Sequence, residues 1–300
     1  MKNLIQKLMR YAFLKLTSLA IFFRIKPNYT YLNFKKFSIL LPVNHLLPEY
    51  LKNHPKYDRQ LPIISKSIKK NETIIDIGAN VGDSLASMVN QNPNPNFLCI
   101  EPDDEFFNYL IKNIKRIRLN IKNKHIYAVK SFIGKKISNV SLEKKSGTAK
   151  AKPNSGNLLS IPLDEVLKDF EDLKKIKLIK IDTDGFDYDV IMSSLNTIRK
   201  HKPMLFFECD CAYEFQKRNY LNTIKKLHSL GYKNWTVFDN YGQIVVLTSD
   251  LKVIFELIDY IWQQTLKKTT RTIYYFDFLT YCNNDKSRIT KVMQDIKKYN

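Results

Sequence analysis

The chain has 300 residues, of which 49 are Lys or Arg and 29 are Asp or Glu, so its formal net charge is +20. Hydrophobic residues make up 44% and charged residues 26%, a balance that is typical of a folded globular protein and excludes a disordered tail. The length suits one large domain with extensions, or two domains. The four cysteines have no paired CxxC spacing, which argues against a structural zinc site and favours a reducing, intracellular setting.

The N-terminal segment is both apolar and basic. Its apolar stretch from Tyr11 to Phe23 is interrupted by Lys15 and is shorter than the roughly 20 residues that a membrane-spanning helix needs. It also lacks the small-residue cleavage site of a secretory signal. We therefore expect residues 1–26 to form a basic, apolar helix, a candidate peripheral anchor for an anionic membrane surface on the cytoplasmic side. Residues 27–70 contain five prolines and are expected to form an irregular substrate or lid segment.

From residue 71 onward, short apolar runs alternate with helical patterns, and a polar segment over residues 134–157 predicts an irregular hairpin. Continuous apolar strands that alternate with helices are typical of a parallel sheet covered on both faces. The sequence thus predicts an α/β fold with a doubly wound, seven-stranded, mostly parallel sheet over residues 71–250. Residues 251–300 are expected to add a C-terminal extension of helix, strand and helix packed on this core. The expected strands are 73–78, 96–102, 125–132, 177–183 and 204–210, with a hairpin of 235–238 and 243–247. The expected helices begin near 85 and cover 103–118, 163–170, 188–200 and 213–230.

The most informative run is Asp76-Ile-Gly-Ala-Asn-Val-Gly-Asp83, where the first strand turns into a helix. Glycine in this turn permits close approach of a nucleotide-like ligand to the main chain. Glu101 ends the second strand, roughly 20 residues further on, where a carboxylate can accept both hydroxyls of a ribose. Two acids flanking the turn would repel phosphates but attract a sulfonium and an ammonium, so they favour S-adenosylmethionine over a dinucleotide. The predicted cofactor site is Asp76, Gly78, Asn80, Gly82, Asp83, Glu101 and Pro102. The alternative is that Asp83 caps the next helix and Asp76 is an ordinary strand-end acid.

The chain resembles the FkbM-type S-adenosylmethionine-dependent methyltransferases over about residues 45–210. The matching stretches, in chain order, are Glu72–Asp83, Cys99–Pro102, Ile161–Val166, Leu178–Asp187 and Pro203–Glu208. The resemblance implies a Rossmann-like class I methyltransferase fold and methyl transfer to a hydroxyl, often on a sugar or polyketide. At the fourth strand the usual sequence of the family resembles K-I-D-V-E-G-x-E, and this chain has Asp184 and Asp187 at the positions where Glu is common in the family. The segments His45-Leu-Leu-Pro and Tyr57-Asp-Arg resemble those of family members that act on surface glycans.

Several acids follow the central strands, where the acceptor must meet the cofactor. An alcohol is a poor nucleophile until its proton is removed, so Asp182 or Asp184 is the predicted general base, with help from His45. A second interpretation is that Asp182, Asp184, Glu208 and Asp210 hold a divalent ion such as Mg²⁺, which lowers the pKa of a bound hydroxyl. A third is structural: Asp184-Gly185 is a turn and Asp187 caps the next helix.

Three functions compete at this point. The first is an O-methyltransferase that acts on a saccharide, polysaccharide or glycolipid at the cytoplasmic membrane face. The second is an RNA or DNA methyltransferase, which the charge of +20 suggests, although Asp182-Thr-Asp-Gly-Phe-Asp is acidic where phosphate would pass. The third is a non-catalytic scaffold that keeps the fold. The sequence favours the first, with S-adenosylmethionine as cofactor, and leaves the oligomeric state undetermined.

Overall fold

The computed structural model describes residues 29–55, 59–122, 125–135, 140–145, 147–153, 159–170, 172–173, 175–267 and 270–299. The predicted N-terminal helix over residues 1–26 lies outside the described residues, as do Tyr57 and Asp58 of the second glycan-like segment.

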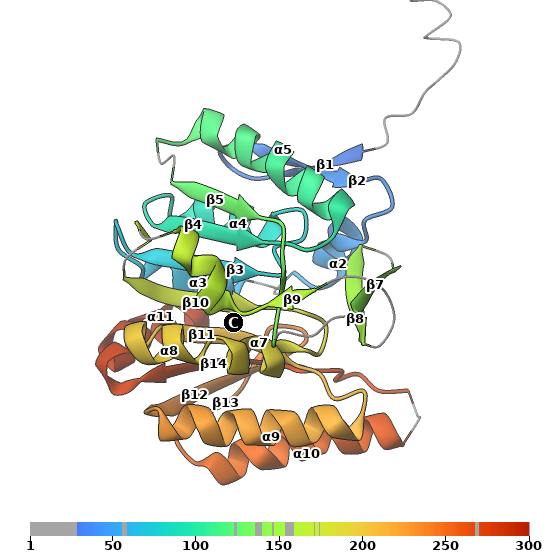
Figure 1. Cartoon of the computed structure of the whole chain (residues 1–300), viewed down its shortest axis with the longest axis vertical. Helices are drawn as coiled ribbons and strands as arrows, with labels where there is room; N and C mark the ends of the chain where they lie inside the picture. Colours follow the sequence, from blue (N-terminus) through green and yellow to red (C-terminus); the bar gives the residue numbers. More distant parts are fainter. Residues whose placement is uncertain are drawn as a thin grey trace, which may run out of the picture.

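A central sheet of eight strands runs through the described part of the chain in the order β13-β12-β14-β11-β10-β3-β4-β5 (Figure 1). Neighbouring strands from β11 to β5 are parallel, and β14 and β13 run antiparallel to the strands beside them. The mostly parallel sheet is confirmed, with eight strands in place of the predicted seven. The strand bounds are β3 (Thr73–Ile77), β4 (Asn96–Ile100), β5 (Ile126–Val129), β10 (Ile176–Ile181), β11 (Met204–Cys209), β12 (Tyr232–Asp239), β13 (Ile244–Thr248) and β14 (Phe276–Cys282).

The additional strand comes from the C-terminal residues. The sequence predicts a strand within residues 251–300, and this strand, β14, lies between β11 and β12 with Thr280 beside both Leu205 and Trp235. The last 50 residues therefore complete the middle of the sheet. Since β14 follows β12 and β13 in the chain and still separates β12 from β11, no local sequence pattern reveals its position.

Helices cover both faces of the sheet, which confirms the doubly wound arrangement. Two separate clusters of buried apolar side chains form the core, and neighbouring strand residues such as Ile74 and Ile75 belong to different clusters. The helices that contribute to the first cluster are α3 (Gln60–Lys66), α4 (Asp83–Gln91), α5 (Asp104–Asn120) and α11 (Lys286–Tyr299). Those that contribute to the second are α6 (Leu163–Val166) with the 3₁₀ turn η1 (Leu167–Asp169), α7 (Asp187–Ser193), α8 (Leu195–His201), α9 (Glu214–Ser229) and α10 (Leu251–Leu266).

One predicted helix is divided. The pattern over residues 188–200 predicts a single helix, whereas the structure has α7 and α8, with Ser194 as the cap of both. The Ser194 hydroxyl donates to the carbonyl oxygen of Val190 at 2.7 Å. Such a bond to the preceding turn competes with regular helix geometry and often bends the backbone.

The segment expected to be irregular is ordered over its described residues. It forms a hairpin of β1 (Tyr29–Asn33) and β2 (Ser38–Pro42), then α2 (Leu47–Asn53) and α3. Its prolines do not prevent this, because Pro48 and Pro62 lie in the first turns of α2 and α3, where no helical N–H is needed. Asn113 of α5 fastens the hairpin by bonding both the N–H and the carbonyl oxygen of Leu40, at 2.7 and 2.8 Å.

The remaining elements include a second hairpin and two short strands. The hairpin predicted over residues 134–157 is present as β7 (Val140–Lys145) and β8 (Thr148–Pro153). Two short strands, β6 (Phe132–Ile133) before this hairpin and β9 (Ser160–Ile161) after it, pair in parallel with each other. The 3₁₀ turn η2 (Asn283–Asp285) precedes α11. None of the described helices has both the length and the hydropathy that a membrane span requires.

Candidate functional site

The turn between β3 and α4 lies where the order of the parallel strands reverses, since the chain moves to β4 and β5 on one side of β3 and to β10 and β11 on the other. Crevices at such reversals are where α/β sheets bind ligands. Gly78 has φ of +74°, and a Cβ atom on it would lie 1.9 Å from the carbonyl oxygen of Asp182. Gly82 has φ of +87° and caps α4. A side chain at Gly78 would therefore separate the turn from the end of β10.

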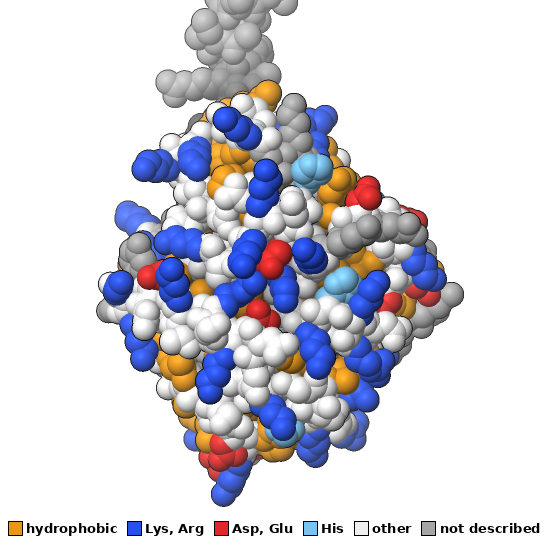
Figure 2. Space-filling model, turned by 90° about the vertical axis from the view of Figure 1, so that its left-hand side faces the viewer, with side chains coloured by type: hydrophobic (Ala, Val, Ile, Leu, Met, Phe, Trp, Pro, Cys, Tyr) orange, Lys and Arg blue, Asp and Glu red, His pale blue; other side chains and the backbone are white. Residues whose placement is uncertain are grey.

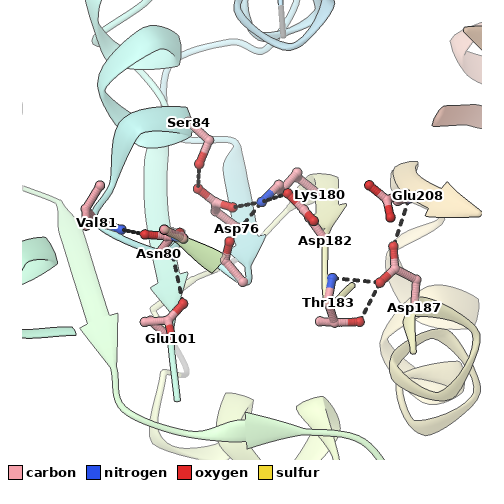
Figure 3. Close-up of polar contacts among 12 residues, drawn as sticks. Asp76, Asn80, Val81, Ser84, Glu101, Lys180, Asp182, Thr183, Asp187 and Glu208 are labelled. Carbon is pink, nitrogen blue, oxygen red and sulfur yellow. Dashed lines mark hydrogen bonds and ion pairs between the residues drawn. The ribbon is translucent and has the colours of Figure 1, made fainter. Parts of the chain in front are cut away.

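A buried lysine joins Asp76 of the predicted cofactor site to Asp182, a predicted base. The Nζ atom of Lys180 lies 3.3 Å from Asp76 Oδ1 and 3.2 Å from Asp182 Oδ2, and it donates to the carbonyl oxygen of Gly78 at 2.9 Å (Figure 3). Asp76 is fully buried and also accepts a hydrogen bond from Ser84 Oγ at 2.5 Å. Lys180 thus binds the cofactor turn, the end of β3 and the end of β10 to one another. The sequence prediction missed it, although a lysine within the buried apolar run Ile176–Ile181 is the signal that could have revealed it.

Glu101 is 3% exposed and holds the far side of the turn. Its two carboxylate oxygens accept hydrogen bonds from the backbone N–H of Asn80 and of Asp103, each at 2.8 Å. Burial raises the pKa of Glu101 to about 7, although these two hydrogen bonds oppose the rise. Each oxygen retains a second lone pair, so the predicted bonds to ribose hydroxyls remain available to it. Pro102 follows directly and is half-buried.

The opposite flank of the turn brings together His45, Asp83 and the β7–β8 hairpin. Asn80 accepts a hydrogen bond from the N–H of Val81 and donates one to the carbonyl oxygen of Gly147 in the hairpin, both at 2.7 Å. The His45 ring packs so closely on Gly147 that a Cβ there would lie 3.1 Å from its Nδ1. Burial raises the pKa of the Asp83 carboxyl, and the charge of His45 opposes this rise. The predicted catalytic histidine therefore lies beside the cofactor turn.

The acids that follow β10 differ in their surroundings. The side chain of Asp182 is 45% exposed, and Lys180 engages one of its oxygens. Asp184 and Gly185 have φ of +52° and +96°, so they form the turn that the structural interpretation predicts. Left-handed φ at a non-glycine residue is tolerated mainly by Asp and Asn, which accounts for the residue type at position 184.

Asp187 is fully buried and has a structural role. It accepts hydrogen bonds from the N–H and the hydroxyl of Thr183 and, at 2.8 Å, from the N–H of Glu208, so it joins the loop after β10 to β11 (Figure 3). Burial and then the charge of Asp182 raise its pKa to about 7. The structural interpretation predicts that Asp187 caps the next helix. Its carboxylate instead accepts hydrogen bonds from Thr183 and Glu208.

Glu208 is the most strongly perturbed of these acids. Burial, followed by the charges of Asp182 and Asp187, raises the pKa of Glu208 well above its usual range. Within the described part of the chain, no group of three or more His, Cys, Asp or Glu side chains is arranged to hold a metal ion. The predicted alternative set of Asp182, Asp184, Glu208 and Asp210 therefore does not form a metal site here, and Lys180 is the cation beside Asp182.

Comparison with known proteins decides the family. The model of the methyltransferase FkbM domain matches residues 76–233, which is just over half of the chain. The chain belongs to the FkbM methyltransferase family. It is therefore a methyltransferase, and its strand order β5-β4-β3-β10-β11-β14-β12, with β13 added at the edge, is that of a doubly wound sheet.

Solved structures of methyltransferases are distant from this FkbM chain. A precorrin-6y C5,15-methyltransferase from Geobacter metallireducens is 10% identical with a TM-score of 0.39, over 74% of this chain and 87% of that one. The methyltransferase FkbM from Methylobacillus flagellatus is 19% identical with a TM-score of 0.39, over 55% of this chain and 38% of that one. A SAM-dependent methyltransferase from Aquifex aeolicus is 11% identical with a TM-score of 0.40, over 78% and 92%. No curated protein sequence matches the chain.

Proposed function

We propose that this FkbM methyltransferase transfers a methyl group from S-adenosylmethionine to a hydroxyl of a saccharide, polysaccharide or glycolipid. The family membership supports methyl transfer, and the glycan-like segment at His45 supports the acceptor class. The observation that carries the chemical step is the half-exposed Asp182 carboxylate at the carboxyl end of β10, held by the same buried lysine that binds the cofactor turn.

The residues of the turn fit the methyl donor. The two carboxylates that flank the turn, the buried Asp76 and the half-buried Asp83, favour a cationic ligand over a phosphate, and Gly78 lets the main chain approach it. The unused lone pairs of Glu101 suit the two ribose hydroxyls. When bound, the donor supplies an electrophilic methyl group on a sulfonium.

The protein's own residues then orient and deprotonate the acceptor. Lys180 holds Oδ2 of Asp182 in place, and Oδ1 of this exposed carboxylate can then accept a hydrogen bond from the hydroxyl of the acceptor. A hydroxyl that is hydrogen-bonded to Asp182 transfers its proton to the carboxylate as its oxygen approaches the methyl carbon. A positioned base of this kind contributes typically about 10²–10⁴-fold in rate. Asp184 is the second candidate base, and His45, beside the turn, is proposed to help hold the acceptor.

Replacing the base without changing its shape tests this assignment. The Asp182→Asn variant should lose roughly 10²–10⁴-fold in kcat/KM and keep its affinity for S-adenosylmethionine, because the amide cannot take the proton. Asp184→Asn is the matched control, two residues away in the same loop, and should lose less than about tenfold. The reverse ranking of the two variants would move the role of base to Asp184.

The acceptor itself is found by comparing cells with and without the gene. Mass spectrometry of envelope glycans should show one methyl group missing from one sugar when the gene is absent. If the missing methyl group is found on RNA, the nucleic-acid interpretation replaces this one. We also propose that residues 1–26 bind the protein peripherally to the cytoplasmic face of an anionic membrane, as their apolar and basic composition suggests.

A further inference from the structure

A cavity lies at the opposite end of the sheet from the predicted cofactor turn. It has a volume of about 860 Å³ and opens between the end of α3, the starts of β3 and β10, and α11. The five residues of β3 separate it from Gly78, a span of roughly 17 Å at the usual rise of a strand. Its lining residues are Ile63, Lys66, Ser67, Lys69, Glu72, Lys177, Asn284, Asp285, Ser287, Arg288, Lys291, Val292 and Asp295.

The charge of this cavity is predominantly positive. Five of its lining residues are Lys or Arg and three are Asp or Glu. Figure 2 shows this face of the molecule, where Lys and Arg side chains surround a small central group of acidic ones. A local excess of one sign of charge in a concave site concentrates ligands of the opposite sign.

Two of the three acidic residues that line the cavity, Glu72 and Asp285, form ion pairs with Arg288. Arg288 donates to Glu72 Oε2 and Oε1 at 2.9 and 3.2 Å, and its Nε lies 3.4 Å from Asp285 Oδ1. It also donates to the carbonyl oxygen of Ser67 at 3.0 Å. These side chains are at most 17% exposed, so they form a rigid, internally paired floor that offers little negative charge to a ligand.

The lysines, by contrast, stand around the opening. Lys66, Lys69 and Lys291 are exposed, and Lys177 is half-buried at the start of β10. Burial, the charge of Lys200 and the charge of Lys177 together lower the pKa of His201, which shows that the charge of Lys177 acts on nearby groups. Among the lining residues, Ser287 and Asn284 add a hydroxyl donor and an amide donor.

We propose that this cavity binds a ligand carrying several closely spaced phosphate groups, with the lysines at its opening as the anion-binding side chains. Lysine ammonium groups bind phosphate as mobile point charges, and several around one cavity match a polyphosphate better than a single anion. The site is separate from the cofactor turn, so this proposal goes beyond methyl transfer. The phosphates of a free molecule and those of a lipid headgroup would satisfy the same lysines.

Isothermal titration of the full chain with tripolyphosphate tests the proposal. The test variant combines Lys69→Gln, Lys177→Gln and Lys291→Gln, which removes three positive charges around the opening. The control variant combines Lys115→Gln, Lys252→Gln and Lys267→Gln, which removes the same charge from exposed positions on α5, on α10 and at the C-cap of α10. The cavity variant should bind tripolyphosphate at least roughly tenfold more weakly than the wild type, and the control less than about twofold more weakly. Equal losses in the two variants would show that only the net charge matters and would overturn the proposal.

Two further measurements complete the test. Circular dichroism and thermal melts show whether the cavity variant is folded. The single variant Lys177→Arg keeps the positive charge, so it should bind tripolyphosphate more tightly than Lys177→Gln if position 177 acts through its cation. Vesicles containing cardiolipin, whose headgroup carries two phosphates, distinguish the sources of phosphate. Residues 1–26 are present in the wild type and in both variants, so the comparison between the variants reports on the cavity. If vesicle binding falls in the cavity variant and not in the control, the ligand is a lipid headgroup; if it is equal in both, the ligand is a free phosphate compound. Failure of tripolyphosphate to bind the folded wild type would contradict the proposal, whatever the outcome for methyl transfer.

Discussion

Replacing Lys180 with methionine removes the cation that joins the cofactor turn to the predicted base. Lys180 is 5% exposed, and Met has a similar length without the charge. The variant leaves the buried Asp76 carboxylate with only its hydrogen bond from Ser84. Removing one partner of a buried pair typically costs about 3–5 kcal/mol. The contact to Asp182 adds little, because that side chain is 45% exposed and solvent screens the pair.

We therefore expect Lys180→Met to lower the free energy of unfolding by about 3 kcal/mol, which corresponds to a fall in Tm of roughly 6–12 °C. Urea unfolding and thermal melts measure this loss, and calorimetry should show weaker binding of S-adenosylmethionine, because the carbonyl of Gly78 loses its donor. The matched control is Lys177→Met on the same strand, where a half-buried lysine has no ion pair among the described contacts, and the loss should be below about 1 kcal/mol.

A double-mutant cycle isolates the pair itself. Asp76→Asn keeps the hydrogen bond from Ser84 but removes the buried charge, so Lys180→Met should cost less in this background by about 1–3 kcal/mol. If the two substitutions are additive within about 0.5 kcal/mol, the reasoning about Lys180 is refuted, since the lysine then stabilises the protein without acting on Asp76.

The other predictions concern the turn, its acid and the N-terminal segment. Gly78→Ala should reduce affinity for S-adenosylmethionine at least roughly 100-fold in calorimetry, because its Cβ would lie 1.9 Å from the carbonyl oxygen of Asp182. The control is Gly231→Ala, where φ is +98° and the nearest atom to the added Cβ is 3.8 Å away. This control should lose about 1–2 kcal/mol of stability and no affinity. Because the pKa of Glu101 is raised to about 7 from 4.5, the folded protein holds a proton there that the unfolded chain releases, so stability should fall as the pH rises through this window. Donor affinity should rise through about pH 7 as the carboxylate forms. Glu101→Gln should remove the pH dependence of donor affinity and reduce that of stability, to which Asp187 also contributes. Deleting residues 1–26 should release the protein from anionic liposomes and leave methyl transfer to a soluble acceptor intact; unchanged liposome binding would rule out the anchor.

The sequence predicts those parts of the fold that local patterns determine. The buried strand at Thr73–Ile77 and the glycine turn after it each depend on residues within a few positions of one another, and each is present. The position of β14 depends instead on pairing with β11 and β12, which are distant in the chain. The order of residues 29–55 likewise depends on contacts with α5, such as that of Asn113 with Leu40, and prolines alone do not predict them.

The candidate site follows the same division. Acids at strand ends can be found from the sequence, but their roles depend on burial, and burial distinguishes the structural Asp187 from the half-exposed Asp182. A search for acids does not find Lys180, and its partner Asp76 lies on a different strand, so only the register that pairs Lys180 with Asp76 reveals the contact. The partners of His45 could not be predicted because they come from a hairpin some 100 residues further along the chain.

The function proposed for this protein depends on what the turn after β3 binds, and a crystal structure with S-adenosylhomocysteine tests this directly. The sulfur compound is predicted to lie against Gly78 and Gly82, with its ribose hydroxyls on Glu101 and its sulfur facing Asp182. Density for the ligand at any other place, or NAD occupying this crevice in a parallel soak, would contradict the account.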